Sequence, residues 1–201
     1  GKLLTDLDCT QGTRQGGVLS CLFFCVGINP VLLKAQEKGI PTIGYIDDLT
    51  SFCSAQQVKE VFDIFRTELY QLGLKINHKK TVIYVPRSTW SRLTQTQQSE
   101  ISACGVVSHT WIRILGTPFG DTKDPESLKE MQQFVDEQRQ KTQPILAKLQ
   151  HALFQQAPET AYTLLSMCCL GRMNFLARNV EKTVLTEDIC KSFDDDIYQT
   201  F

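Results

Sequence analysis

The sequence lacks the marks of a secreted, membrane-spanning or zinc-binding protein. Its eight cysteines include no Cys-x-x-Cys pair and no histidine at zinc-ligand spacing, so we expect reduced, mostly buried thiols. The uncharged run from Gln15 to Leu33 is interrupted by glycine, asparagine and proline and has no charged leader, which favours a buried helix over a membrane span or signal peptide. These absences predict an intracellular protein, nuclear or cytoplasmic, with no membrane partner.

An excess of positive charge is also lacking. Lysine and arginine number 21 against 22 aspartates and glutamates, which gives a formal charge of −1. Proteins that hold a nucleic acid unaided normally cluster cations that displace counterions, so we do not expect this chain alone to bind one tightly. Positive charge is nevertheless concentrated in the middle of the sequence, at Lys79, Lys80, Arg87, Arg92 and Arg113.

The composition is that of an ordinary globular protein. With 201 residues, 42% of them hydrophobic, the chain can bury one sizeable core, or one core and a small second domain. The pattern changes near residue 120: residues 1–120 mix strands with helices, and residues 121–201 are wholly helical. We therefore predict an α+β fold in two regions, without internal repeats or low-complexity linkers.

In the first region, Ser54 and Gln57 form a capping box, and Gly73 ends the apolar helical pattern that follows. This amphipathic helix is expected to cover an antiparallel sheet. Extended segments are predicted over 74–77 and 81–85 and a strand over 109–115, with a short helix opened by Thr94 and Gln97. The uncharged helix after Ser20 is expected to pack through Phe23, Phe24 and Val26 beneath the hairpin that is predicted over 40–53.

In the second region, Asp124 and Pro125 have the cap-then-proline pattern of a helix start, and Pro144 is expected to divide the helix that follows. Further helices are predicted over 158–178 and near the C-terminus. The predicted inner faces are formed by Leu128, Met131, Val135, Gln138, Leu164, Leu165, Cys168, Leu176, Ile189, Phe193, Ile197 and Phe201.

Two adjacent carboxylates, Asp47 and Asp48, lie where one apolar run reverses into another. The flanking runs, 40–46 and 49–53, are rich in β-branched and aromatic residues and predict a β-hairpin with the aspartates at its tip. Two exposed carboxylates suit a hard cation such as Mg²⁺ or Mn²⁺. The simpler interpretation is structural, because aspartate is common in turns.

The order of the surrounding motifs favours the functional interpretation. Upstream, residues 12–20 read Gly-Thr-Arg-Gln-Gly-Gly-Val-Leu-Ser. Downstream, residues 72–81 read Leu-Gly-Leu-Lys-Ile-Asn-His-Lys-Lys-Thr and 114–116 read Ile-Leu-Gly. Together with Tyr-Ile-Asp-Asp, this order resembles the reverse transcriptase family, and within it the LINE-type retrotransposon branch without long terminal repeats. The resemblance implies a partial polymerase palm over 1–120 and a thumb-like helical region over 121–201.

The resemblance also implies roles for single residues. Asp47 would be the direct metal ligand, with Asp48 in the same site. Lys80 would lie near the leaving pyrophosphate as a general acid. The nucleotide pocket would be lined by Gln15, Gly16 and Tyr45, and the primer backbone would be held by a strand at Leu115 and Gly116. The expected partners are an RNA template, a DNA primer and deoxynucleoside triphosphates.

Simpler interpretations exist for several of these residues. Gly16 and Gly17 could form a flexible helix entrance, and Lys79 and Lys80 a solvated turn. Arg172 and Arg178 could contact phosphates, but a charged helix face is the commoner explanation for such residues.

The family's first carboxylate, on a strand before the Gln-Gly loop, has no match here. Asp6 and Asp8 lie too near the loop and are expected to be surface or turn residues. Two-metal nucleotidyl transfer needs that carboxylate, so we expect the chain to be a segment of a longer polyprotein, inactive without its N-terminal remainder. The chain also has Ser20-Cys21 where the family usually has Ser-Pro.

Three functions stay open from the sequence. The first is an RNA-directed DNA polymerase, a nucleotidyltransferase. The second is a non-catalytic nucleic-acid-binding or assembly protein derived from a retroelement. The third is an RNA-dependent RNA polymerase palm or a nucleotide cyclase, although Gln15 and Tyr45 favour reverse transcriptase over RNA polymerase, and a cyclase would lack a thumb.

Overall fold

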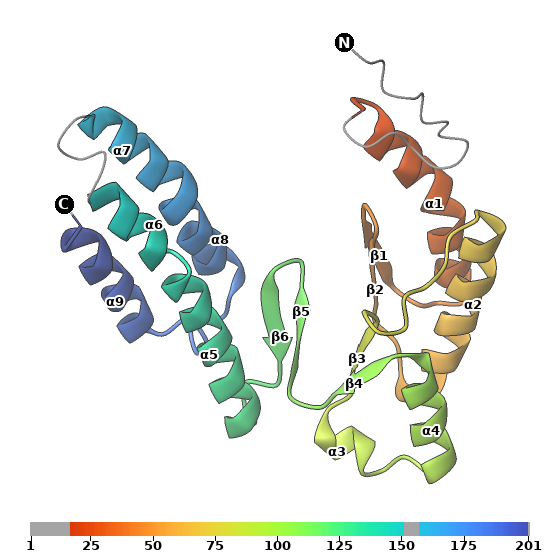
Figure 1. The fold of residues 1–201 in the computed structure, drawn as a ribbon. Coiled ribbons are helices and arrows are strands. Elements are labelled where there is room, and N and C mark those ends of the chain that lie inside the picture. Colours follow the sequence, from red (N-terminus) through yellow and green to blue (C-terminus); the bar gives the residue numbers. More distant parts are fainter. Residues whose placement is uncertain (1–16, 151–156, 201) are drawn as a thin grey trace. The chain divides into compact units, whose positions relative to one another are not determined.

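The computed structural model describes residues 17–150 and 157–200. The chain forms two compact units (Figure 1). The first contains Gly1–Val82 and Arg92–Val107, and the second contains Ile83–Ser91 and Ser108–Phe201. Within the second unit, the hairpin over 111–120 packs on the first long helix. The expected catalytic carboxylates all belong to the first unit.

The first unit consists of helices and short strands. Its helices are α1 (Ser20–Glu37), the 3-10 turn η1 (Ala55–Gln57), α2 (Val58–Gln71) and α4 (Gln95–Cys104). Strands β1 (Thr42–Tyr45) and β2 (Asp48–Ser51) form an antiparallel hairpin. Strand β3 (Val82–Tyr84) pairs with β4 (Val106–Ser108), and the chain passes from one unit to the other within these two strands.

The predicted starts of α2 and α4 and the predicted end of α2 are confirmed. Ser54 and Gln57 form the capping box before α2, and Thr94 and Gln97 form another before α4. Gly73, with φ of +75°, ends α2, where the Leu74 N–H donates to the carbonyl of Leu69 at 2.8 Å. Glycine adopts this left-handed conformation without the penalty that a Cβ would bring.

The expectation of one sheet covered by α2 is wrong. The described strands form three separate two-stranded ribbons. The helix packed on β1 is α1, and Gly44 permits the approach because a Cβ there would lie 3.2 Å from Leu32. Residues 74–77 form no strand. At one end of this segment the Leu74 N–H bonds to the end of α2, and at the other end the Asn77 carbonyl accepts hydrogen bonds within a turn.

The expected burial of α1 and of the cysteines is also corrected. Phe23 and Val26 are 59% and 64% exposed and Phe24 is half-buried, while the buried side chains of α1 are Ile28, Val31 and Ala35. Among the described cysteines only 104 and 169 are buried, and 21, 25, 53 and 168 are exposed. Burial raises the pKa of the Cys104 and Cys169 thiols, which makes them poor nucleophiles.

The second unit begins with the short helix α3 (Arg87–Trp90) and the hairpin of β5 (Trp111–Ile114) and β6 (Thr117–Gly120). Helices α5 (Pro125–Gln140), α6 (Gln143–Lys148), α7 (Pro158–Leu164), α8 (Gly171–Asn179) and α9 (Glu187–Tyr198) follow, with a π-helical segment η3 (Leu165–Leu170) joining α7 to α8. The predicted cap at Asp124 and the division at Pro144 are confirmed.

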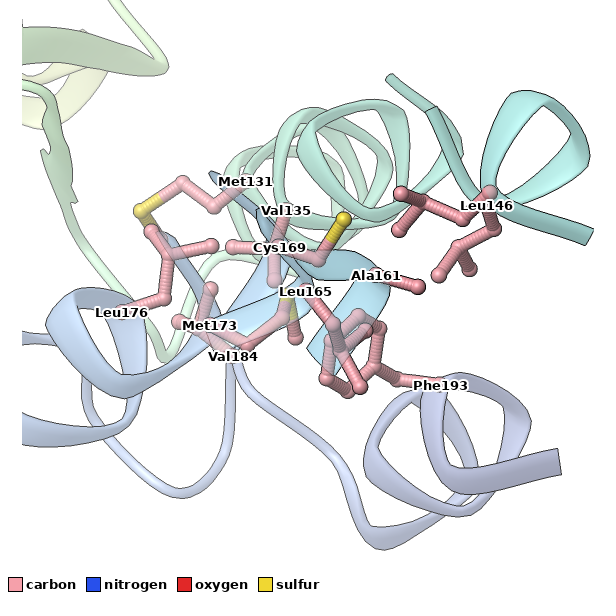
Figure 2. Close-up of a cluster of buried hydrophobic side chains, with 11 residues drawn as sticks. Met131, Val135, Leu146, Ala161, Leu165, Cys169, Met173, Leu176, Val184 and Phe193 are labelled. Carbon is pink, nitrogen blue, oxygen red and sulfur yellow. The ribbon is translucent and has the colours of Figure 1, made fainter. Parts of the chain in front are cut away.

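The main hydrophobic core of the second unit is built from its helices (Figure 2). Met131 and Val135 of α5 meet side chains of η3 and α8, and Phe193 of α9 closes one side, as the helical spacing predicts. Predicted Phe201 lies outside the described residues. Arg139 of α5, only 13% exposed, pairs with Asp136 at 2.7 Å and with Asp196 of α9. The first unit has a much smaller cluster, formed by Ala35, Ile40 and Val61.

Candidate active site

The two aspartates lie at the tip of the β1–β2 hairpin, as predicted. Tyr45 is paired with Asp48, so Ile46 and Asp47 alone form the turn. Ile46 has φ of +55°, in the left-handed region that β-branched residues rarely adopt. The backbone at this tip is therefore strained, a feature that is concentrated at functional sites.

The carboxylates of Asp47 and Asp48 are exposed, and neither forms an ion pair or side-chain hydrogen bond with the described part of the chain. Tyr45 is 60% exposed beside them. Exposed oxygen ligands without a protein cation are the donor type that Mg²⁺ and Mn²⁺ prefer. The hairpin fits part of a divalent-metal site. No group of three or more His, Cys, Asp or Glu residues placed to hold a metal occurs within 17–150 and 157–200.

Lys80 is presented by a turn that Asn77 organises. The side-chain oxygen of Asn77 accepts the Lys79 N–H at 3.1 Å, and its carbonyl accepts the Lys80 N–H at 3.0 Å. The same carbonyl accepts the N–H and the hydroxyl of Thr81. Asn77 and Thr81 thus fix the backbone while the Lys80 side chain stays exposed. This geometry suits either a solvated turn or a lysine held ready for a phosphate.

Leu115 and Gly116 do not form the expected strand. They are the turn between β5 and β6, with φ of +49° and +87°. Positive φ at both central residues is typical of the type I′ turn of a tight hairpin. A Cβ on Gly116 would lie 3.6 Å from the ring of Phe175 on α8, so this helix contacts the turn.

Other predicted residues are less informative. Gln15, Gly16, Asp6 and Asp8 lie outside the described residues. Arg178 is exposed and Arg172 is half-buried on α8. Of the mid-chain cations, Lys79, Lys80 and Arg92 belong to the first unit, and Arg87 and Arg113 belong to the second. Arg87 pairs with Glu126 at 2.6 Å, and Arg113 lies over the ring of Phe134.

The first unit also has a small hollow, about 210 Å³ in volume, that the sequence motifs did not predict. It is lined by Arg66, Tyr70, Leu74, Lys75, Ile76 and His78. The available signal was a cation and an aromatic four residues apart, at Arg66 and Tyr70, which places both on one face of a helix. No helix within the described residues is long and apolar enough to cross a membrane.

Comparisons with known proteins agree with the motifs. A family model described as reverse transcriptase (RNA-dependent DNA polymerase) matches residues 1–119. Because this is more than half of the chain, the chain belongs to that family, as the motif order predicted. It is also similar to the 132 kDa protein of the retrotransposable element SLACS from Trypanosoma brucei gambiense, with 26% identity over 183 residues. The match covers 89% of this chain and 14% of that protein. No solved structure matches the chain.

Proposed function

We propose that this chain is part of an RNA-directed DNA polymerase of a LINE-type retroelement, and that it carries two of the carboxylates of a two-metal site. The observation that carries the proposal is the β1–β2 hairpin, whose two-residue turn presents Asp47 and Asp48 in a chain of the reverse transcriptase family. The substrates would be an RNA template, a DNA primer and deoxynucleoside triphosphates, and the protein would act inside the cell.

Each candidate residue has a specific task in this proposal. Asp47 and Asp48 would hold Mg²⁺ or Mn²⁺, which when bound supplies charge stabilisation at the transferring phosphoryl group. Tyr45, on the same hairpin, would line the nucleotide pocket close to the primer end, together with Gln15 and Gly16. Lys80 would either donate a proton to the departing pyrophosphate or neutralise part of its negative charge.

The exposed apolar surface of the first unit supports an N-terminal remainder that covers it. Leu22, Phe23 and Val26 lie on one face of α1, Leu19 precedes the helix by one residue, and all four are more than half exposed. Ile28, Val31 and Ala35 pack on another face of the helix. A helix that is apolar on several sides is normally buried, and an isolated two-stranded hairpin is at best marginally stable. A neighbouring segment of a longer protein would cover these surfaces and supply the further carboxylate.

The palm and thumb assignments belong to the same proposal. Residues 1–120 would form the partial palm, and the helices of 121–201 the thumb-like region. Leu115 and Gly116 would contact the primer as a turn rather than as a strand, with Phe175 of α8 behind them. This chain alone would be inactive because two hairpin carboxylates do not complete a two-metal site.

The test is primer extension on an RNA template, with the chain extended to include its N-terminal region. We expect templated DNA synthesis that Asp47→Asn abolishes and that Lys80→Ala slows by about 10² to 10⁴. Lys123→Ala, at an exposed loop lysine before α5, is the matched control and should leave the rate unchanged.

An extended protein that binds primed RNA but incorporates no nucleotide with either metal would overturn the proposal. That result would favour a non-catalytic nucleic-acid-binding or assembly protein. Equal rates for Lys80→Ala and Lys123→Ala would show that Lys80 has no role in the reaction. That result would not contradict the proposed metal site.

A further inference from the structure

Among the described residues, the hollow is lined by Arg66, Tyr70, Leu74, Lys75, Ile76 and His78, and none of these is acidic. It is formed by the C-terminal half of α2 and the segment that follows. Other α2 residues border a second, larger hollow, whose charged lining residues are Glu60, Asp63, Glu68 and Glu100 together with Lys38 and Lys59. Helix α2 therefore separates a basic surface from a largely acidic one.

The charge of the basic surface is unusual for this chain. Residues 66–80 contain four lysines and arginines and a single acid, so their formal charge is +3, whereas the whole chain has −1. The single acid, Glu68, is already paired with Lys34 of α1 at 2.6 Å. Arg66 contacts Asp63 at 2.9 Å, but Asp63 also pairs with Lys59 at 2.8 Å, so these three groups together keep one positive charge. The hollow is consequently a site of positive potential that suits a phosphate.

The floor and rim of the hollow suit a flat ring. Tyr70 is 70% exposed, on the same helix face as Arg66. The half-buried side chains of Leu74 and Ile76 add apolar surface. The ring of His78 is held against the buried ring of Phe62, with the ring centres 5.0 Å apart. Aromatic stacking surfaces beside cations are the usual means of binding single-stranded nucleic acid without sequence preference.

We propose that this hollow binds one unpaired nucleotide of a single-stranded nucleic acid. The base would stack on Tyr70 against Leu74 and Ile76, and the adjoining phosphates would contact Arg66 and Lys75. The volume of about 210 Å³ is below the range of roughly 300–1,000 Å³ that is typical of small-molecule pockets, which favours a single base over a larger ligand. The proposal goes beyond polymerisation, because it needs neither Asp47 nor Asp48.

The experiment is fluorescence anisotropy of labelled oligo(rU) and oligo(dT) with the whole chain, in EDTA and over a salt series. Tyr70→Ala should weaken binding about 5- to 100-fold without changing the salt dependence. Arg66→Ala and Lys75→Ala should each weaken binding and reduce the slope of log K against log salt by about 0.7. Comparison of the two oligonucleotides shows whether the strand bound is RNA, DNA or either.

Lys59→Ala is the matched control. Lys59 and Arg66 lie on the same helix, pair with the same carboxylate of Asp63 and are both exposed, but only Arg66 lines the basic hollow. Lys59→Ala should therefore leave the affinity within about twofold. Thermal melts of all variants show that each is folded, which is expected because the substituted side chains are exposed.

Several outcomes would overturn the proposal: no binding by the unaltered chain, equal losses in Lys59→Ala and Arg66→Ala, or equal affinity for duplex DNA. Loss of binding in Asp47→Asn would place the nucleic acid at the hairpin instead. Retained binding in Asp47→Asn supports the proposal. Because the assay contains no free divalent cation and no nucleoside triphosphate, its result is independent of whether the polymerase activity exists.

Discussion

Tyr45 and Asp48 are directly opposite each other in the β1–β2 hairpin. Directly opposed residues of an antiparallel pair place their side chains on the same face of the sheet. The tyrosine ring and the Asp48 carboxylate are therefore neighbours, while Asp47 projects from the turn. A ligand that contacts Tyr45 is thus brought next to a carboxylate by the register of the hairpin alone.

The first prediction concerns the metal. We expect weak Mn²⁺ binding by this chain, measured by water-proton relaxation, because the hairpin supplies only two carboxylates of a two-metal site. Asp47→Asn should remove this binding. Asp188→Asn, at an exposed aspartate of α9, should not. Tight stoichiometric binding by the chain alone would contradict the prediction.

The second prediction concerns the strained turn. Asparagine tolerates the left-handed region, which costs other residues about 1–2 kcal/mol, so Ile46→Asn should raise the free energy of unfolding by about 0.5–1 kcal/mol. Ile43→Asn is the control, since this exposed isoleucine lies in β1 and asparagine is unfavourable in strands. Urea denaturation measures both variants. If Ile46→Asn loses as much stability as Ile43→Asn, the claim that the backbone at Ile46 is strained is wrong.

The third prediction compares two glycines. A Cβ at Gly120 would lie 2.6 Å from the carbonyl oxygen of Thr110 and 2.8 Å from the hydroxyl oxygen of buried Ser127. Gly120→Ala should therefore destabilise the second unit by about 1–3 kcal/mol. Gly171 begins α8 with ordinary helical space around it, so Gly171→Ala should stabilise by about 0.5–1 kcal/mol. Thermal melting measures both variants. Melting temperatures that change in the same direction for Gly120→Ala and Gly171→Ala would contradict this prediction.

The fourth prediction concerns the ion pairs of α9. Arg139 is largely buried between Asp136 and Asp196, and hydrogen bonds to both carboxylates raise its pKa despite the opposing effect of burial. Arg139→Ala should cost about 1.5–3 kcal/mol, because charged hydrogen bonds are lost and Asp196 is left without its partner.

Lys191→Ala provides the comparison for this ion pair. Lys191 pairs with Glu187 within α9, where both side chains are largely exposed, so its loss should cost less than about 0.5 kcal/mol. Urea denaturation should separate the two variants clearly. Equal costs would mean that Arg139 does not stabilise the contact between α5 and α9.

The sequence alone determined the features that depend on neighbouring residues. The capping boxes at Ser54 and Thr94, the helix end at Gly73 and the start at Asp124 were all predicted, because each is a hydrogen bond or a φ angle within a few residues. The Asp-Asp hairpin was predicted for the same reason. The family followed from the order of such local motifs.

The tertiary structure decided what depends on contacts between distant segments. In the structure, α1 and not α2 packs on β1, and one apolar face of α1 is exposed. Leu115 and Gly116 form a turn that contacts Phe175. It also brought Lys75 and His78 beside Arg66 and Tyr70 to form the basic hollow. A hydrophobic pattern indicates that one face of an element is apolar, but it does not identify the segment that covers this face. The reason is that the hydrophobic effect is non-directional and depends on the apolar area that is buried.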